Sequence, residues 1–335
     1  MRIRPGLAID LGTVNTLVHV AGRGIVVDEP SAVALDGAGR AVAIGAAADA
    51  ISGKAPEGTE VVWPLRDGVV ADIEAVILML NGFLRRAHVH RGLMRPTAVL
   101  CVPRGATSFE RQAVEAAVRA LSPHCGLRMI EEPVAAAVGA GMTAPGTAGA
   151  FVVDIGGGTT EVAAVAGGGV VRARSLRVAG NSMDAAIARA VRSELGFSLG
   201  HRSAERLKIG LGLTGGESAV EVAAVDAASG ALRTARVPGS LVAAAIEPAV
   251  RAIVEVVGEV LSDPDIAAGH ATGCPSTAIA PVVSSVTTKA RPTSTTASPV
   301  PADGVATMVE DDLEHGFANS RAIRGGDGGP SGVSR

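Results

Sequence analysis

The chain has 335 residues, enough for two or three domains with separate hydrophobic cores. Hydrophobic residues make up 47% of the chain and aromatic residues only 2%, so Ala, Val, Leu and Ile must build the cores. The formal net charge of −3 gives no electrostatic argument for nucleic-acid binding. The three cysteines form no C-x-x-C pair, which argues against a zinc site or a disulfide framework. Without an apolar signal segment or a transmembrane run, we expect a cytoplasmic protein.

The first half of the chain has the pattern of alternating strands and helices. Short apolar runs predict strands at 7–10, 17–20, 25–27 and 98–102. Asp72 can cap a helix that reaches about Arg86, because the apolar residues between them keep helical spacing. Thr107 and Glu110 have capping-box spacing before a further helix. This alternation predicts an α/β domain.

A second unit of the same kind begins at Ala150. Its pattern predicts strands at 150–154 and 162–165 and helices at 183–195 and 241–261. Pro248 would kink or break the last of these helices near its start. From Gly269 to Arg335 the chain is rich in Ser, Thr, Pro, Gly and Ala without sustained periodicity, which predicts a disordered tail.

Two glycine-rich loops carry the strongest local signal. Each follows an apolar strand and contains an Asp, then glycine, then hydroxyl residues: Asp10-Leu11-Gly12-Thr13-Val14-Asn15-Thr16 and Asp154-Ile155-Gly156-Gly157-Gly158-Thr159-Thr160. Glycine lets backbone N–H groups approach phosphate oxygens, and Thr hydroxyls can donate to the same oxygens. The Asp at each strand end can hold Mg²⁺ through water. One such loop can be an ordinary tight turn, whereas a pair indicates two related half-domains that face one ligand.

A possible catalytic carboxylate lies between the two loops, in the segment Glu131-Glu132-Pro133. Pro133 suits the first turn of a helix, and the small residues that follow permit close packing across a domain interface. A carboxylate here could orient or deprotonate a water molecule that attacks a γ-phosphate. The alternative is that both glutamates only interact favourably with the helix dipole.

A charged pair forms a further candidate. Glu205 and Lys208 are three residues apart, so they share one face of a helix. The ordinary interpretation is an exposed ion pair. Lys208 is nevertheless one of only three lysines in a chain that otherwise uses Arg.

Taken together, these segments resemble a known family. The two loops, the segment at Glu131, Arg66-Asp67-Gly68-Val69-Val70-Ala71-Asp72 and Arg177-Val178-Ala179-Gly180 look like MreB and its relatives, which are bacterial actin homologues. The resemblance implies an actin-like ATPase fold, in which two related α/β domains, each with a smaller subdomain, surround a nucleotide cleft. The domains would span 1–149 and 150–262, with subdomains near 36–70 and 200–240 and a low-complexity tail at 263–335.

The resemblance also implies a function. The chain would be an ATP-binding cytoskeletal protein of cell shape, which organises cell-wall synthesis in space and is a weak Mg²⁺-dependent ATPase coupled to filament assembly. Its cofactors would be ATP and Mg²⁺. Its partners would be further copies of itself, the inner face of the cytoplasmic membrane, and the machinery of cell-wall elongation or sporulation.

Site residues follow from the resemblance motif by motif. Residues Gly12 to Thr16 would form the first phosphate loop and Gly156 to Thr160 the second, with Asp10 and Asp154 at Mg²⁺, mostly through water. Glu132 matches the position that orients the attacking water. Gly180 and Asp184 match the segment after the second loop. Glu205 and Lys208 match positions near the ribose and base of the nucleotide.

A membrane contact is implied at a separate loop. Leu93 and Met94 resemble an apolar pair that some family members insert into the membrane, and Arg91 and Arg95 could contact anionic lipids. The alternative is a turn with two buried side chains.

The resemblance ends near Asp263. The family continues with a strand and a third glycine-rich loop of the L-T-G-G-G kind, which cups adenosine, and we identify neither in the sequence. We therefore expect a divergent or truncated C-terminal region. One alternative is a degenerate, non-polymerising nucleotide-binding protein of the actin fold. Another is an actin-fold chaperone ATPase, which would need a β-rich peptide-binding domain, and a sugar kinase would need a catalytic Asp that we do not find.

Overall fold

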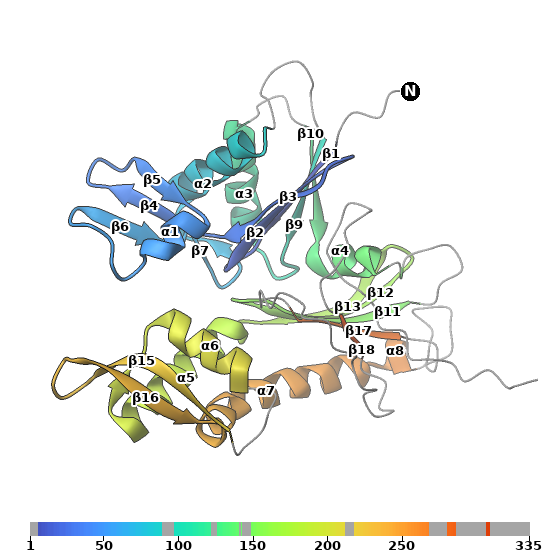
Figure 1. Cartoon of the computed structure of the whole chain (residues 1–335). Helices are drawn as coiled ribbons and strands as arrows, with labels where there is room; N and C mark the ends of the chain where they lie inside the picture. Colours follow the sequence, from blue (N-terminus) through green and yellow to red (C-terminus); the bar gives the residue numbers. More distant parts are fainter. Residues whose placement is uncertain are drawn as a thin grey trace, which may run out of the picture.

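The computed structural model describes residues 6–88, 97–121, 126–140, 142, 149–211, 218–267, 280–285 and 306–308. Two halves lie one above the other, and each half is built on its own five-stranded sheet (Figure 1). Each half also carries a smaller sheet, and both small sheets lie at the same end of the molecule.

The large sheet of the first half has the strand order β10-β9-β1-β2-β3. Its strands are β1 (Gly6–Leu11), β2 (Asn15–Val20), β3 (Gly24–Pro30), β9 (Thr97–Val102) and β10 (Gly126–Glu131). β1, β2 and β3 form an antiparallel meander, whereas β1, β9 and β10 are parallel. Helices α2 (Ile73–Arg86) and α3 (Ser108–Leu121) pack on this sheet through a core that includes Ile9, Met79 and Phe83.

The large sheet of the second half repeats this arrangement. It has the order β13-β12-β11-β17-β18, with β11 (Ala150–Ile155), β12 (Thr160–Ala166), β13 (Gly169–Leu176), β17 (Ala280–Ser285) and β18 (Ala306–Met308). Again three strands form an antiparallel meander, and the first of them continues into parallel pairs. The predicted pair of related α/β halves is confirmed.

One expectation about this sheet was wrong. No strand was expected after Asp263, but β17 pairs in parallel with β11 and β18 pairs with β17. The β17 segment has only six residues and contains a proline, so it carries too little alternation to predict a strand. The remaining residues from 268 onward, including Gly325 to Gly329, lie outside the described residues.

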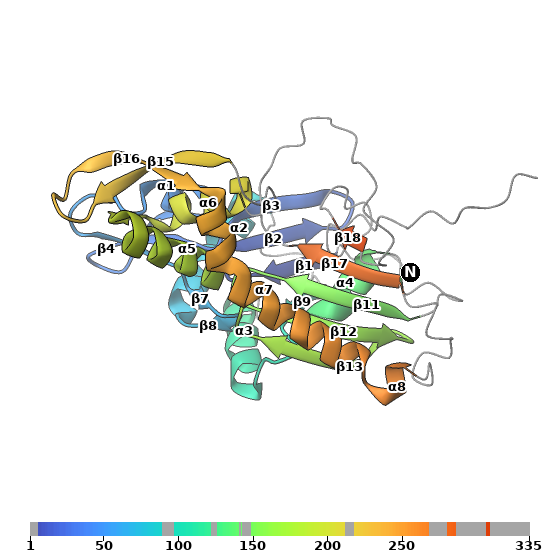
Figure 2. The same ribbon diagram turned by 90° about the horizontal axis from the view of Figure 1, so that it is seen from below.

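Strand β11 is covered on both faces, which explains its continuous apolar sequence. Val152 faces the small residues of α4 (Glu132–Gly139), whereas Phe151 and Val153 face α7 (Gly239–Leu261). Alternate side chains of a strand point to opposite faces, so every position of β11 meets a neighbour. Figure 2 shows α7 running along the underside of this sheet, towards α8 (Pro264–Ala267).

The helix boundaries agree well with the sequence signals. Asp72 is the N-cap of α2 and accepts a hydrogen bond from the Ala75 N–H, at 2.9 Å. Thr107 and Glu110 form the predicted reciprocal capping box. α5 (Gly180–Leu195) begins three residues earlier than expected, and α7 continues through Pro248 instead of breaking there.

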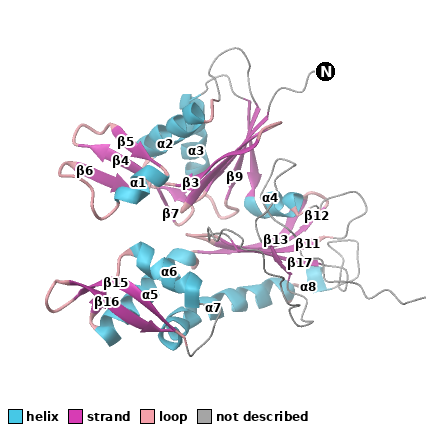
Figure 3. Ribbon diagram, in the orientation of Figure 1, coloured by secondary structure: helices cyan, strands magenta, loops and turns pink. Residues whose placement is uncertain are grey.

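The two smaller sheets belong to the smaller units of each half (Figure 3). In the first half β4 (Val33–Asp36), β5 (Ala41–Ile44) and β6 (Thr59–Val62) lie beside α1 (Ala46–Ile51), and the hairpin β7 (Leu65–Arg66) and β8 (Val69–Val70) follows. In the second half β14 (Phe197–Ser198), β15 (Ala219–Asp226) and β16 (Leu232–Pro238) pack with α5 and α6 (His201–Leu211). These units face each other across the gap between the halves.

Candidate functional site: a cavity between two hairpin loops

The two glycine-rich loops are equivalent hairpin turns of the two halves. The first joins β1 to β2 and the second joins β11 to β12. Both turns are tight: a Cβ on Gly12 would lie 2.6 Å from the Asn15 carbonyl oxygen, and the Gly156 N–H donates to the Thr159 carbonyl at 2.8 Å. Only glycine lets the chain turn this closely at position 12.

The loops also touch each other across the molecule. A Cβ added to Gly157 would lie 2.1 Å from Val14 Cγ2. One added to Gly158 would lie 2.7 Å from both the Asp67 Cα and the Thr13 Oγ1. The missing side chains therefore allow the second loop to approach the first loop and the turn at Asp67.

A cavity opens at this meeting point. The candidate residues that line it are Asp10, Gly12, Thr13, Val14, Asn15, Glu132, Asp154, Gly156, Gly157, Gly158 and Thr159. The structure thus brings together residues from both loops and from the start of α4. Five further residues line the cavity without having been foreseen: Leu11, Leu17, Asp28, Gly68 and Glu161.

Two hydroxyl residues of the loops do not line the cavity. Thr16 is buried, and its hydroxyl shares a 2.8 Å hydrogen bond with the Ser31 hydroxyl. Thr160 is also buried, and its hydroxyl donates to the Val178 carbonyl at 2.6 Å. These two hydroxyls hold the bases of the hairpins in place.

Carboxylates crowd one side of the cavity, and their electrostatics are coupled. Burial raises the pKa of Asp10 to about 7, and the charge of Asp154 adds to this rise. Desolvation also raises the pKa of Glu132 well above its ordinary value, and the charges of Glu161, Asp10 and Asp154 raise it further. Burial and then Asp154 raise the pKa of Glu161 to about 7. This concentration of negative charge favours a bound cation.

The donor set fits a hard divalent cation that keeps part of its water shell. Asp10 and Asp154 are the penultimate residues of the equivalent strands β1 and β11, and both line the same cavity. Carboxylate oxygens are ligands that Mg²⁺ accepts, and Mg²⁺ in proteins usually retains several waters. Within the described part of the chain, no group of three or more His, Cys, Asp or Glu side chains is arranged to hold a metal directly.

The two adjacent glutamates of the α4 segment have different surroundings. Glu131 is the N-cap of α4, and both its oxygens accept hydrogen bonds from the Arg104 guanidinium, at 2.8 and 2.6 Å. Glu132 is the first helical residue and lines the cavity. The alternative that both glutamates only interact with the helix dipole therefore does not describe this arrangement, in which one pairs with Arg104 and the other lines the cavity.

The remaining candidates lie behind the second loop. Lys208 on α6 forms an ion pair with Asp184, at 3.0 Å, and its Nζ donates to the Gly180 carbonyl at 3.2 Å. The Gly180 N–H in turn donates to the Gly156 carbonyl at 3.0 Å. Glu205 lies one turn before Lys208 on α6 and is half-buried. These residues border the second loop but do not line the cavity described above.

Glu161 is the functional candidate that sequence reasoning missed. It stands directly across the β11–β12 hairpin from Asp154, as a hairpin register centred on the glycine loop could have indicated. Leu93 and Met94, the predicted membrane contact, lie outside the described residues. In the part of the chain that is described, no helix is long and apolar enough to cross a membrane.

Comparison with known proteins agrees with this geometry. The sequence model of the family described as MreB/Mbl protein matches residues 4–271. The cell shape-determining protein Mbl of Bacillus subtilis is 38% identical over 260 residues, which cover 76% of this chain and 78% of that protein.

Solved structures give the same relationship. MreB5 of Spiroplasma citri bound to ADP is 30% identical, with a TM-score of 0.73 and coverage of 84% of each chain. The AMPPNP-bound form of the same protein is also 30% identical, with a TM-score of 0.70, and covers 80% of this chain and 82% of that chain.

The repeated five-stranded sheets and the facing hairpin loops define a protein of the actin-like fold. Within that class, the chain belongs to the MreB/Mbl family.

Proposed function

We propose that this chain is a bacterial cytoskeletal protein of cell-shape determination, which binds Mg-ATP between its two hairpin loops and hydrolyses it slowly. The observation that carries the proposal is the meeting of both glycine-rich loops with Asp10, Asp154 and Glu132 in one cavity. The names of the relatives, Mbl and MreB, support the role in cell shape, and the ADP and AMPPNP in MreB5 support nucleotide binding.

In this proposal the loops hold the phosphate tail. Backbone N–H groups of Gly12 to Asn15 and of Gly156 to Thr159 donate to phosphate oxygens, and the hydroxyls of Thr13 and Thr159 add further donors. Asp10 and Asp154 hold the Mg²⁺, which supplies charge neutralisation at the phosphates. The nucleotide's sugar and base lie towards Gly180, Asp184, Glu205 and Lys208, behind the second loop.

Glu132 orients the attacking water. Burial is the main cause that raises its pKa and disfavours the ionised form, the charge of Glu161 comes next, and the charges of Asp10 and Asp154 add to both. When those two charges are neutralised, that repulsion disappears and the carboxylate ionises more readily. A loaded site therefore favours the ionised form of Glu132, which can accept a hydrogen bond from the attacking water.

The direct experiment compares wild type with Glu132→Ala in the presence of Mg-ATP. We expect Glu132→Ala to abolish phosphate release while the thermal shift caused by Mg-ATP remains, because Glu132 acts on water and not on the nucleotide. The matched control is Glu247→Ala, which removes an exposed helical Glu paired with Arg251. If the wild-type protein shows no thermal shift with Mg-ATP, the ATPase proposal fails and a degenerate, non-binding protein is the better description.

Self-association and membrane attachment belong to the same proposal. Electron microscopy of the Mg-ATP form tests whether filaments assemble.

For membrane binding, we expect wild type to sediment with anionic liposomes. The double variant Leu93→Ser/Met94→Ser should stay in the supernatant, because it loses the two apolar side chains that would insert into the membrane. Equal sedimentation of the two proteins would remove this site. If wild type sediments and the double variant does not, the proposal extends to attachment at the inner membrane face. It then also includes cooperation with the machinery of cell-wall elongation or sporulation.

A further inference from the structure

Glu161 occupies a position that no part of the phosphate-loop scheme explains. Its side chain is 1% exposed and lines the cavity from strand β12 of the second half. Its Oε2 is buried and has no hydrogen-bond partner among the described residues. A buried carboxylate costs free energy unless it is paired or fully hydrogen-bonded, so the position of Glu161 needs an explanation.

The other oxygen of Glu161 connects the two halves of the molecule. Oε1 accepts a 2.7 Å hydrogen bond from the backbone N–H of Arg104, in the turn after β9 of the first half. The next residue in that turn, Gly105, lies against Ser175 of the second half, where a Cβ would come 3.3 Å from the Ser175 Cβ. Arg177 of the second half is also 3.8 Å from Glu110 of α3. Glu161 thus lies in a contact between the halves that several residue pairs form.

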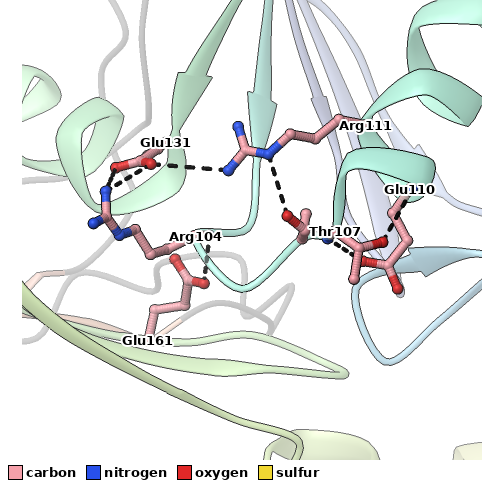
Figure 4. Close-up of polar contacts among 7 residues, drawn as sticks. Arg104, Thr107, Glu110, Arg111, Glu131 and Glu161 are labelled. Atoms are coloured by element: carbon pink, nitrogen blue, oxygen red, sulfur yellow. Dashed lines mark hydrogen bonds and ion pairs between the residues drawn. The ribbon is translucent and has the colours of Figure 1, made fainter.

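The same turn also contacts Glu131, the residue directly before Glu132 (Figure 4). The Arg104 guanidinium donates to both oxygens of Glu131, at 2.8 and 2.6 Å. Arg111 supports this arrangement, because its guanidinium lies 3.8 Å from Glu131 and its Nε donates to the Ala106 carbonyl at 3.2 Å. Since Glu131 is the N-cap of α4 and Glu132 is the next residue, the turn holds the start of the helix that carries Glu132.

We propose that Glu161 is a positioning residue for hydrolysis: through the Arg104 turn and Glu131 it fixes where Glu132 stands relative to the second phosphate loop. The proposal rests on the ATPase function proposed above. It assigns Glu161 no contact with the reacting atoms. α4 already packs on β11 and β12 of the second half through residues after Glu132, so the Arg104 turn adds a second tie, at the end of the helix where Glu132 stands.

The experiment measures kcat and KM for Mg-ATP hydrolysis by the full chain. Glu161→Ala removes the acceptor for the Arg104 N–H, and Arg104→Ala removes the ion pair with Glu131 but keeps that N–H. We expect each variant to lose about 10- to 100-fold in kcat with little change in KM, since misplacement of a catalytic group by about 1 Å has effects of this size. Glu161→Gln keeps an acceptor oxygen, so we expect it to retain most of the wild-type kcat.

The double variant distinguishes a shared path from two independent defects. If Glu161 acts through Arg104, the double variant Glu161→Ala/Arg104→Ala loses little more kcat than either single variant. Glu247→Ala again serves as the control for loss of an acidic side chain, because it is exposed on α7.

Several results would overturn the proposal. These are an unchanged kcat in Arg104→Ala, losses that multiply in the double variant, or a Glu161→Gln variant as slow as Glu161→Ala. If Glu161→Ala does not fold, Arg104→Ala and Glu161→Gln decide the question. A wild-type protein that neither binds nor hydrolyses Mg-ATP would refute the ATPase function itself, which is seen without any variant, and this proposal would fall with it.

Discussion

At the scale of single residues, the cavity depends on two glycines, which have no side chain to separate the loops. Gly157 and Gly158 let the second loop lie against Val14, Thr13 and the backbone of Asp67. The two glycines differ in one respect: the two atoms nearest to Gly157 belong to the Val14 side chain, whereas those near Gly158 include the Asp67 Cα and nitrogen, which give way only if the backbone moves. Gly158 is therefore the stricter requirement.

We expect Gly158→Ala to destabilise the protein by about 1–3 kcal/mol, the usual cost of forcing a methyl group into a filled site. The new Cβ would lie 2.7 Å from the Asp67 Cα and 2.9 Å from its nitrogen, so the loop must move away from the first half. Chemical denaturation measures the stability, and the thermal shift with Mg-ATP measures the expected weaker binding. Gly169→Ala is the matched control, because a Cβ added there would have nothing within 4 Å and the backbone is unstrained. Equal stability of the two variants would contradict the packing argument.

At the residue scale, the sequence indicated the two loops that line the cavity but not Glu161. Glycine, Asp and Thr in a fixed order predict a phosphate loop because the signal lies within one segment. Glu161 belongs to the same segment, but its role depends on a hydrogen bond with Arg104, which is 57 residues away in sequence. Spacing within one segment carries no information about such a contact.

At the scale of elements, helix starts were predicted well because caps are encoded within a few residues. Asp72 caps α2, and the apolar residues Val76, Met79, Leu80 and Phe83 beneath it are fully buried. The capping box of Thr107 and Glu110 starts α3 in the same way. Strand β17 shows the opposite case, because its short segment becomes a strand only by pairing with β11.

For α2 we expect Asp72→Ala to cost about 1 kcal/mol of unfolding free energy, the typical value of an N-cap. Asp72→Asn should retain most of this stability, because its side-chain oxygen can still accept from the Ala75 N–H. Urea denaturation of both variants measures the difference. An Asn variant as unstable as the Ala variant would show that the charge, and not the hydrogen bond, supports the helix.

At the scale of the whole molecule, the two small units meet across the outer side of the gap between the halves. Arg202 at the start of α6 donates through Nε to Asp49 of α1, at 3.1 Å, and the two side chains form an ion pair. Both side chains are partly exposed, so the pair contributes modestly to stability. Because the pair joins the two halves, we expect it to oppose their separation.

We expect Asp49→Ala to speed nucleotide release by up to about fivefold, because an exposed ion pair contributes no more than about 1 kcal/mol. Stopped-flow release of a fluorescent ATP analogue measures this rate, and the wild-type rate should rise with salt, since salt screens the pair. Asp36→Ala is the control, because its partner Arg40 lies in the turn between β4 and β5 of the same half, so no contact between the halves is lost. If both variants release nucleotide at the wild-type rate, the pair does not hold the halves together.

The sequence by itself determined the parts of this protein whose signals are local: the two glycine loops, the caps of α2 and α3, the Pro-led start of α4 and the repeated strand pattern that indicates the actin-like class. Only the tertiary structure decided what those parts do to one another. It brought Asp10 and Asp154 into one cavity, turned Glu131 towards Arg104 while Glu132 faced the cavity, and placed Glu161 at the contact between the halves. The physical reason is range: turns and caps are set by neighbours a few residues apart, whereas the cavity arises from packing between segments far apart in the chain.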